Sequence, residues 1–434
     1  YFLRFRFISM RFGSSGIRAL YGRELVTAAL ALGKVLGRRH PEVVVGRDTR
    51  TTSRVMENAF SAGALSEGAV VRAAGLVPTP AVAGAVPAGG AGCMVTASHN
   101  PEEYNGLKVF NPGGSSLLKS QQEETERLLT EELTATGLTS PPGHFGTVAG
   151  DDILGTYIEG IIEDVHCARE VRMVLDCGNG AGSVASPGVL RGLGVDRKCI
   201  NCCPSGHFPR PSEPLEENVK YLGSLVRRWN ADGAVVHDGD ADRMMAFDSR
   251  GRYISGDHLL VLFTRFLGAQ KVVTTTDASM AIEEWAKVRR TPVGDSYVSE
   301  ELVRWGDLGG EPSGAWIFPG HSLCPDGPYA AALFCRMASE WDIATELDAI
   351  PIYPVLRASL PCTRAPEVMK ALGAAVPTDG IRVEEDDGWY LVRASGTEPK
   401  IRVTAEGRTR GAAEALLGKG LSAVRHWKKE IKRQ

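Results

Sequence analysis

A buried strand that ends at a tight turn and leads into a helix is the pattern that most constrains this fold, and it recurs along the chain. The strand-like runs lie at 43–45, 171–175 and 271–275, and helical periodicity covers 24–36, 53–65 and 278–288. Short apolar runs that alternate with helices are typical of α/β units, in which helices cover a sheet. The sequence therefore predicts three α/β units in series.

The C-terminal part follows a different pattern. Two strand-like runs at 388–392 and 401–404 precede a helical stretch at 411–427, which predicts a smaller α+β domain. Proline- and glycine-rich segments at 141–143, 249–251 and 351–354 are the candidate boundaries. We therefore expect four domains, at 1–145, 146–249, 250–354 and 355–434.

Charge and hydropathy exclude several classes of protein. The 49 Lys and Arg nearly balance the 52 Asp and Glu, and no basic stripe with interleaved aromatic residues occurs, which argues against nucleic acid as a partner. No apolar run approaches the roughly 20 residues that span a bilayer. Residues 1–9 lack the pattern of a signal peptide, and we expect them to be an extension upstream of Met10.

The nine cysteines are odd in number and scattered, which predicts reduced thiols in a cytoplasmic protein. Cys199 and Cys202 form one C-x-x-C pair. Because no second pair follows at the distance found in zinc ribbons, an ordinary strand end is favoured over a structural metal site.

The segment Thr-Ala-Ser-His-Asn-Pro at 96–101 follows the apolar run 93–95. Asn-Pro disfavours helix at this point, so the strand is expected to stop in a turn that exposes the hydroxyl of Ser98. Ser98 is thus a candidate nucleophile. The alternative is a hydrogen-bonded turn without a chemical role.

Asp238, Asp240 and Asp242 crowd into five residues between two strand-like runs. Carboxylates this close require a counter-ion or raised pKa values, and a hard divalent cation such as Mg²⁺ satisfies them. The spacing also imitates the start of a calcium-binding EF-hand loop. Arg243 and Ser249 occupy the positions at which that loop needs glycine and glutamate, so the calcium interpretation is poor. A solvated acidic turn is the remaining alternative.

Two further loops carry polar groups. Arg-Ala-Ser-Gly-Thr-Glu-Pro at 393–399, followed by Arg402, offers donors and a flexible backbone that suit a phosphate dianion. A polar hairpin is the alternative for this segment. Gly-Glu-Pro-Ser-Gly at 310–314 places an acceptor and a hydroxyl in a loop that suits sugar hydroxyls, although alone it indicates little.

In this order the four segments resemble the α-D-phosphohexomutase family, which includes phosphoglucomutase/phosphomannomutase and phosphoglucosamine mutase. The resemblance begins at Arg11 and includes Phe-Gly-Ser-Ser-Gly-Ile-Arg at 12–18, Gly-Arg-Asp-Thr-Arg at 46–50 and Tyr-Asn-Gly-Leu-Lys at 104–108. It implies three similar α/β domains with mixed sheets and a smaller α+β domain around a central cleft. The implied reaction converts a hexose 6-phosphate to the 1-phosphate through a phosphoserine enzyme and a hexose bisphosphate.

The resemblance also implies roles by position. The implied metal ligands are Ser98, Asp238, Asp240 and Asp242, and the implied catalytic residues are Ser98, His99, Lys108, Arg18 and Arg243. The implied sugar-binding residues are Glu311, Ser313, Gly294 and Asp295. The implied phosphate-binding residues are Arg393, Ser395, Gly396, Thr397 and Arg402.

The base in such a reaction takes the proton of the sugar hydroxyl, and the resemblance points to Lys108. A lysine base requires a lowered pKa, which burial beside cations would provide. The alternative for Lys108 is an exposed side chain. Mg²⁺ and a catalytic hexose bisphosphate, of glucose or glucosamine, are the implied cofactors, and a monomer or homodimer is expected.

One departure concerns the sugar loop. Many relatives have a histidine where this chain has Ala315, and His321 is a candidate replacement, although a solvent-exposed loop histidine is the plainer interpretation. The sugar loop of this chain looks like that of archaeal members.

The segment 291–297 resembles the Val-Gly-Asp loop of phosphoglucosamine mutases, which favours glucosamine phosphate. A phosphomannomutase/phosphoglucomutase of broad specificity is the main alternative. A phosphatase or a non-catalytic sugar-phosphate-binding protein is less favoured.

Overall fold

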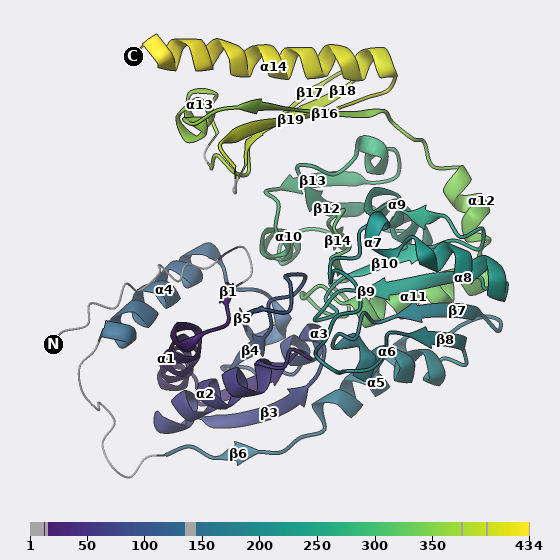
Figure 1. The fold of residues 1–434 in the computed structure, drawn as a ribbon. Helices are drawn as coiled ribbons and strands as arrows, with labels where there is room; N and C mark the ends of the chain where they lie inside the picture. Colours follow the sequence, from purple (N-terminus) through teal and green to yellow (C-terminus); the bar gives the residue numbers. More distant parts are fainter. Residues whose placement is uncertain (1–12, 14–15, 135–144, 375, 396–397, 434) are drawn as a thin grey trace.

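The computed structural model describes residues 13, 16–134, 145–374, 376–395 and 398–433. Four β-sheets follow one another along this part of the chain (Figure 1). The first three are mixed sheets flanked by helices, and the fourth is antiparallel. The predicted fold class, three α/β units and a C-terminal α+β domain, is confirmed.

The first sheet has the strand order β1-β5-β4-β2-β3-β6. Its strands are β1 (Ile17–Leu20), β2 (Glu42–Arg47), β3 (Val70–Leu76), β4 (Ala91–Val95), β5 (Tyr104–Phe110) and β6 (Val148–Ala149). Its helices are α1 (Arg23–Arg39), α2 (Ser53–Ser66), α3 (Thr79–Gly84), the short η1 (Pro112–Gly114) and α4 (Lys119–Thr134). The helices predicted over 24–36 and 53–65 thus form, as does the strand at 43–45.

The second sheet has the order β11-β10-β9-β7-β8. Its strands are β7 (Arg172–Asp176), β8 (Asp196–Ile200), β9 (Gly233–His237), β10 (Met244–Phe247) and β11 (Tyr253–Ile254). The helices of this region are α5 (Ile153–Asp164), α6 (Gly182–Gly192), α7 (Glu216–Val219) and α8 (Tyr221–Trp229). Because β6 belongs to the first sheet and β11 to the second, these sheets extend a few residues past 145 and 249.

The third sheet has the order β13-β12-β14-β15. Its strands are β12 (Lys271–Thr275), β13 (Lys287–Thr291), β14 (Leu308–Gly310) and β15 (Trp316–Ile317). The accompanying helices are α9 (Gly256–Leu267), η2 (Met280–Glu284), α10 (Asp295–Leu302), α11 (Gly327–Glu340) and α12 (Ile343–Asp348). One hydrophobic core joins the second and third sheets, from Ile161 to Ile350, and α11 is buried within it.

The prediction of a helix over 278–288 is wrong. The chain forms only the short 3₁₀ helix η2 there, which Ser279 caps by accepting a hydrogen bond from the amide of Ala281, and it enters β13 at Lys287. Residues 287–291 alternate between more and less exposed side chains, which is the period of a strand. Because residues 287–291 have this strand pattern, the helix ends before them.

The fourth sheet, of order β16-β19-β18-β17, consists of β16 (Val355–Pro361), β17 (Ile381–Glu385), β18 (Gly388–Ala394) and β19 (Lys400–Gly407). The helix α13 (Ala365–Ala371) lies beside it, and the long α14 (Arg410–Arg433) lies across one face (Figure 1). The predicted strand pair and closing helix are confirmed. Within the described part of the chain, no helix combines the length and apolar character that a membrane crossing requires.

Candidate active site

Ser98 lies in the loop that follows β4, with an unusual backbone conformation for a serine. Its φ is 51°, in the left-handed region that residues other than glycine seldom adopt. The buried guanidinium of Arg50 holds this loop by donating hydrogen bonds to the carbonyls of Ser98 and Asn100, both at 2.8 Å, and of Tyr104 at 3.0 Å. Such strained conformations persist where the surroundings fix them, often at functional sites.

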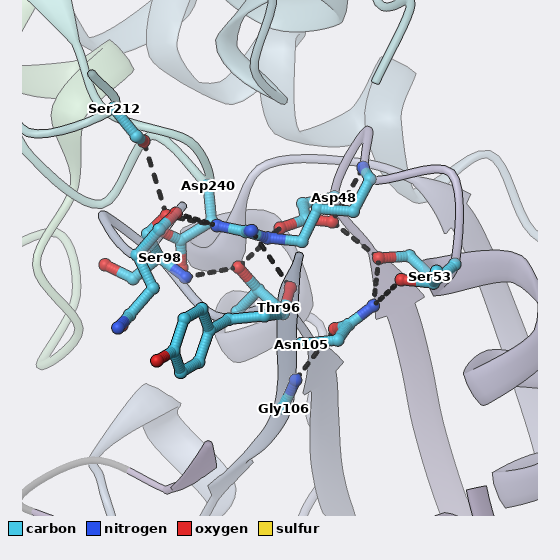
Figure 2. Close-up of polar contacts among 12 residues, drawn as sticks. Asp48, Ser53, Thr96, Ser98, Asn105, Gly106, Ser212 and Asp240 are labelled. Atoms are coloured by element: carbon cyan, nitrogen blue, oxygen red, sulfur yellow. Dashed lines mark hydrogen bonds and ion pairs between the residues drawn. The ribbon is translucent and has the colours of Figure 1, made fainter. Parts of the chain in front are cut away.

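Asp48 is the second anchor of the loop. Its carboxylate accepts hydrogen bonds from Arg50 Nε at 2.9 Å, Ser53 Oγ at 2.6 Å and Thr96 Oγ1 at 2.7 Å (Figure 2). Thr96 Oγ1 in turn accepts the amide of Ser98 at 2.8 Å. No role was predicted for Asp48 or Arg50 from the sequence. Their position directly after a buried strand is the signal that could have identified them.

The Asp loop follows β9, so its carboxylates emerge at the carboxyl end of that strand, where α/β folds commonly bind ligands. Asp238, Asp240 and Asp242 are all buried, and one carboxylate oxygen from each lies within 4.8 Å of the others. The Oδ1 atoms of Asp240 and Asp242 have no hydrogen-bond partner among the described residues. Because buried, unpaired carboxylate oxygens are costly, this donor set fits a hard divalent cation.

The Asp loop and the serine loop are in direct contact, although they come from different domains. Ser98 Oγ donates a hydrogen bond to Asp238 Oδ2 at 3.0 Å. Burial, with Asp240 and Asp242 next, raises the pKa of Asp238. Ser212 Oγ also donates to the carbonyl of Ser98 at 3.3 Å (Figure 2). The predicted nucleophile therefore lies at the edge of the predicted metal site.

Lys108, on β5, contacts the other side of the Asp loop. Its Nζ donates to Asp240 Oδ2 at 2.7 Å and Asp242 Oδ2 at 2.5 Å, and the residue is 2% exposed. Burial lowers the pKa of Lys108, but the two carboxylates outweigh it and the net shift is upward. The expected lowering by neighbouring cations is wrong, because the nearest charged groups are carboxylates. The exposed alternative is wrong as well.

Two arginines and a histidine line a cavity of about 260 Å³. Arg18 and His99 reach it from the first domain and Arg243 from the second. Burial, followed by Arg243 and Arg18, lowers the pKa of His99 to about 3, so its imidazole is neutral at neutral pH. Its Nδ1 lies 3.4 Å from Ser98 Oγ.

The third domain supplies acidic groups to the same cavity. The buried carboxylate of Glu311 accepts the amide of Gly294 at 2.7 Å and the hydroxyl of Ser313 at 3.2 Å, and so joins the two predicted sugar loops. Burial, with Asp295 next, raises the pKa of Glu311 to about 7. Asp295 and Glu213 also line the cavity.

The described residues of the predicted phosphate loop lie outside this group. Of its residues, Gly396 and Thr397 fall outside the described part of the chain. Arg393 and Arg402 pair across β18 and β19, and Arg402 contacts Glu398 at 3.4 Å. No described residue of the fourth domain lines the cavity. The structure therefore brings together the predicted site residues of the first three domains, whereas the described residues of the fourth domain lie apart from them.

Family models described as phosphoglucomutase/phosphomannomutase alpha/beta/alpha domains I, II and III match residues 9–136, 155–251 and 255–350. The C-terminal domain of the same family matches residues 358–419. The chain belongs to the phosphoglucomutase/phosphomannomutase family. It is an enzyme, a phosphohexomutase of the isomerase class, and it transfers a phosphoryl group between two positions of a hexose phosphate.

The relatives of this phosphohexomutase extend over nearly the whole chain. A protein of Methanocella arvoryzae named "probable phosphoglucosamine mutase" is 41% identical and covers 95% of this chain and 98% of its own. One of the same name from Methanosarcina acetivorans is 42% identical, with 92% and 95% covered.

Solved structures share the fold. A phosphoglucomutase/phosphomannomutase family protein of Burkholderia thailandensis has a TM-score of 0.84 at 24% identity, with 97% of this chain and 98% of its own covered. An Aspergillus fumigatus N-acetylphosphoglucosamine mutase in complex with GlcNAc-6P and magnesium has a TM-score of 0.61 at 17% identity, with 96% of each chain covered. At these low sequence identities, the similarity shows a shared fold only.

Ala315 lines the active-site cavity of the phosphohexomutase, where many family members are expected to carry a histidine. Its backbone forms a β-bridge with Arg243, which ties the sugar loop to the Asp loop. His321 does not replace that histidine. It stacks on Tyr329 with ring centroids 3.9 Å apart, contacts Asp326 at 3.1 Å and lines a different cavity. It is partly buried, so the exposed alternative is wrong as well.

Proposed function

We propose that this phosphohexomutase interconverts glucosamine 6-phosphate and glucosamine 1-phosphate. The observation that carries the proposal is the group of three carboxylates, Glu213, Asp295 and Glu311, in the cavity that Ser98 also lines. Asp295 is partly buried, and its carboxylate forms no hydrogen bond or ion pair with another residue in the described part of the chain. Glucosamine phosphates carry an ammonium group at neutral pH, and a carboxylate without a cation partner is a suitable acceptor for it.

Ser98 is the proposed carrier of the phosphoryl group. It gives the group to the free hydroxyl of the sugar phosphate, and the resulting bisphosphate turns around and returns its other phosphoryl group to Ser98. His99 lies within reach of Ser98 Oγ and is assigned to carry one proton: it passes the proton of the attacking sugar hydroxyl to Ser98 Oγ in the first transfer, and it returns the serine proton to the departing sugar oxygen in the second. Arg18 and Arg243 oppose the charge of the phosphoryl oxygens, since such transfers depend chiefly on positioning and electrostatic stabilisation.

Mg²⁺ is the proposed cation of the Asp loop. Asp238, Asp240 and Asp242 would hold it with Ser98, and it would neutralise charge on the transferred group. Lys108 is assigned a positioning role, because it occupies the Oδ2 atoms of Asp240 and Asp242 while the Oδ1 atoms keep no partner among the described residues.

The sugar and its distal phosphate are assigned to the remaining residues. Glu311 and Ser313, with Gly294, are assigned to the sugar hydroxyls. The proposed phosphate-binding residues are Arg393, Ser395, Gly396, Thr397 and Arg402. Because the described part of the fourth domain does not line the cavity, productive binding requires that domain to approach the substrate.

We further propose a cytoplasmic monomer or homodimer that uses a catalytic hexose bisphosphate and has no nucleic-acid or membrane partner. The near balance of charge argues against a nucleic-acid partner, and the free cysteines support the cytoplasmic assignment.

The experiment is a coupled mutase assay with Mg²⁺ and a trace of hexose bisphosphate, on the 6-phosphates of glucosamine, glucose and mannose. Ser98→Ala should abolish turnover of all three. Asp295→Asn should lower kcat/KM for the glucosamine substrate about tenfold or more and spare the neutral sugars, since a charged hydrogen bond contributes about 1.5–3 kcal/mol.

Glu300→Gln, on the same helix and outside the cavity, is the matched control and should leave the ratio of sugars unchanged. Equal losses of Asp295→Asn on all three sugars would reject the assignment of Asp295. Faster turnover of glucose or mannose phosphate than of glucosamine phosphate by the unmodified enzyme would favour the broad-specificity alternative.

A further inference from the structure

Three cysteines of the second domain meet where β7 and β8 end. Cys177 directly follows β7, Cys199 lies in β8, and Cys202 follows β8 after a turn. Cys177 is buried, Cys202 is partly buried and Cys199 is exposed. The Sγ atoms of Cys177 and Cys202 lie 2.9 Å apart. The catalytic assignments above use none of these thiols.

The arrangement favours a bond between two sulfurs over a metal site. A disulfide has an S–S length of about 2.05 Å, so Cys177 and Cys202 require an approach of less than about 1 Å. The two residues lie on the ends of adjacent parallel strands, where the amide of Cys177 contacts the carbonyl of Ile200 at 3.4 Å. Among the described residues, the three cysteines do not form a group whose ligand atoms all lie within 4.8 Å of one another.

We propose that Cys177 and Cys202 form a reversible disulfide when the enzyme meets a low-molecular-weight disulfide. The thiolate of Cys202 attacks one sulfur of the small disulfide, forms a mixed disulfide and releases one small thiolate. The thiolate of Cys177 then attacks the Cys202 sulfur, closes the protein S–S bond and releases the second small thiolate. Two protein thiols thereby lose two protons and two electrons, and one small disulfide becomes two thiols.

We expect slow exchange at this pair at neutral pH. The contact with Cys177 is the largest influence on Cys202 and, with burial, it raises the pKa of the thiol. Because the thiolate is the attacking species, the fraction able to react is small. Because Cys202 is partly exposed and Cys177 is buried, Cys202 is the thiol assigned to the first attack.

The pair is connected to the Asp loop through the residue that precedes it. The Asp176 carboxylate accepts a hydrogen bond from Arg210 Nε at 3.2 Å, and Arg210 Nη2 donates to the carbonyl of His237 at 2.7 Å. His237 immediately precedes Asp238. On the other side, the amide of Ala181 donates to the carbonyl of Gly239 at 2.9 Å.

Because hydrogen bonds from residues on both sides of Cys177 hold the start of the Asp loop, we expect a displacement of Cys177 to shift the first residues of that loop. Changes just outside a metal's ligands commonly lower affinity 10- to 100-fold, and we expect about a tenfold loss of apparent Mg²⁺ affinity in the oxidised enzyme.

The first test is chemical and does not depend on activity. The folded enzyme is incubated with a small disulfide, denatured, alkylated and digested. The expected result is two fewer alkylated residues than the nine cysteines, and a peptide that joins positions 177 and 202. Cys202→Ser should abolish the joined peptide, whereas Cys203→Ser, an exposed neighbour, should retain it.

A cross-link between Cys199 and Cys202, or only mixed disulfides on exposed cysteines, would overturn the pairing. The second test measures the Mg²⁺ concentration that half-maximally protects the reduced and oxidised enzyme against urea. The expected increase, reversed by a dithiol and absent in Cys202→Ser, supports coupling. Equal Mg²⁺ dependence of the two forms overturns it. Neither test requires that glucosamine phosphate be the substrate.

Discussion

Lys108→Met tests the claim that a buried cation holds the Asp loop together. Lys108 comes from the first domain and contacts Asp240 and Asp242 of the second, and all three residues are almost fully buried. Methionine conserves much of the volume, so the loss is mainly electrostatic. Removal of one partner from a buried ion pair costs about 3–5 kcal/mol, because the remaining charge stays buried without compensation. We expect the free energy of unfolding to fall by that amount.

The assay is urea unfolding in the presence of a chelator, followed by tryptophan fluorescence. The control is Lys419→Met, because the ion pair of Lys419 with Glu385 is exposed and such pairs contribute about 0–1 kcal/mol. Saturating Mg²⁺ should restore more stability to Lys108→Met than to the unmodified enzyme, since it supplies the missing positive charge. A loss below about 1 kcal/mol, as expected for a solvated lysine, would refute the reasoning.

Three further changes test the substrate site. Arg393→Ala should weaken sugar-phosphate binding about tenfold or more and leave Mg²⁺ binding unchanged, because a charged hydrogen bond contributes about 1.5–3 kcal/mol; parallel losses in kinetic and Mg²⁺ titrations would contradict this. Glu311, with a pKa of about 7, is ionised above that pH and protonated below it. If the ionised carboxylate accepts the sugar hydroxyls, kcat/KM should fall about tenfold per pH unit below pH 7. In Glu311→Gln this decrease should be absent, whereas the decrease caused by protonation of the substrate phosphate near pH 6 should remain. Gly239→Ala would place a Cβ 2.6 Å from the carbonyl of Ser98 and should lower kcat about a hundredfold, whereas Gly84→Ala, with nothing within 4 Å of its Cβ, should not.

The sequence was sufficient to predict the parts of the site that local chemistry defines. Three carboxylates within five residues need a counter-ion or raised pKa values when they are buried, and Asp238, Asp240 and Asp242 are indeed buried together. A serine in a turn directly after a buried strand was likewise identifiable, and Ser98 contacts Asp238. These inferences needed only the neighbouring residues.

The sequence was insufficient where a residue depends on distant partners. The shift of Lys108 has the opposite direction from the one expected, because its partners lie 132 and 134 residues away and are carboxylates. The prediction that His321 replaces the missing histidine is wrong for the same reason, since its contacts with Asp326 and Tyr329 place it at another cavity. The helix predicted over 278–288 failed because strand pairing of Lys287 with Lys271 extends the third sheet. In each case the deciding interaction was tertiary.

The attachment of the fourth domain bears on the proposed reorientation of the bisphosphate. The buried carboxylate of Glu406, on β19, accepts Ser279 Oγ and the amide of Met280 from the third domain, both at 2.7 Å, and Trp389 Nε1 at 2.6 Å. Arg402 lies four residues earlier on the same strand, about 13 Å away at about 3.3 Å per residue. Arg382 of the fourth domain also donates to the carbonyls of Thr276 at 2.9 Å and Ala278 at 3.1 Å, so a rotation about the Glu406 contact that displaces the proposed phosphate loop must break these hydrogen bonds. The domain can stay attached to its neighbour while the loop withdraws, which gives the intermediate room to turn without leaving the enzyme.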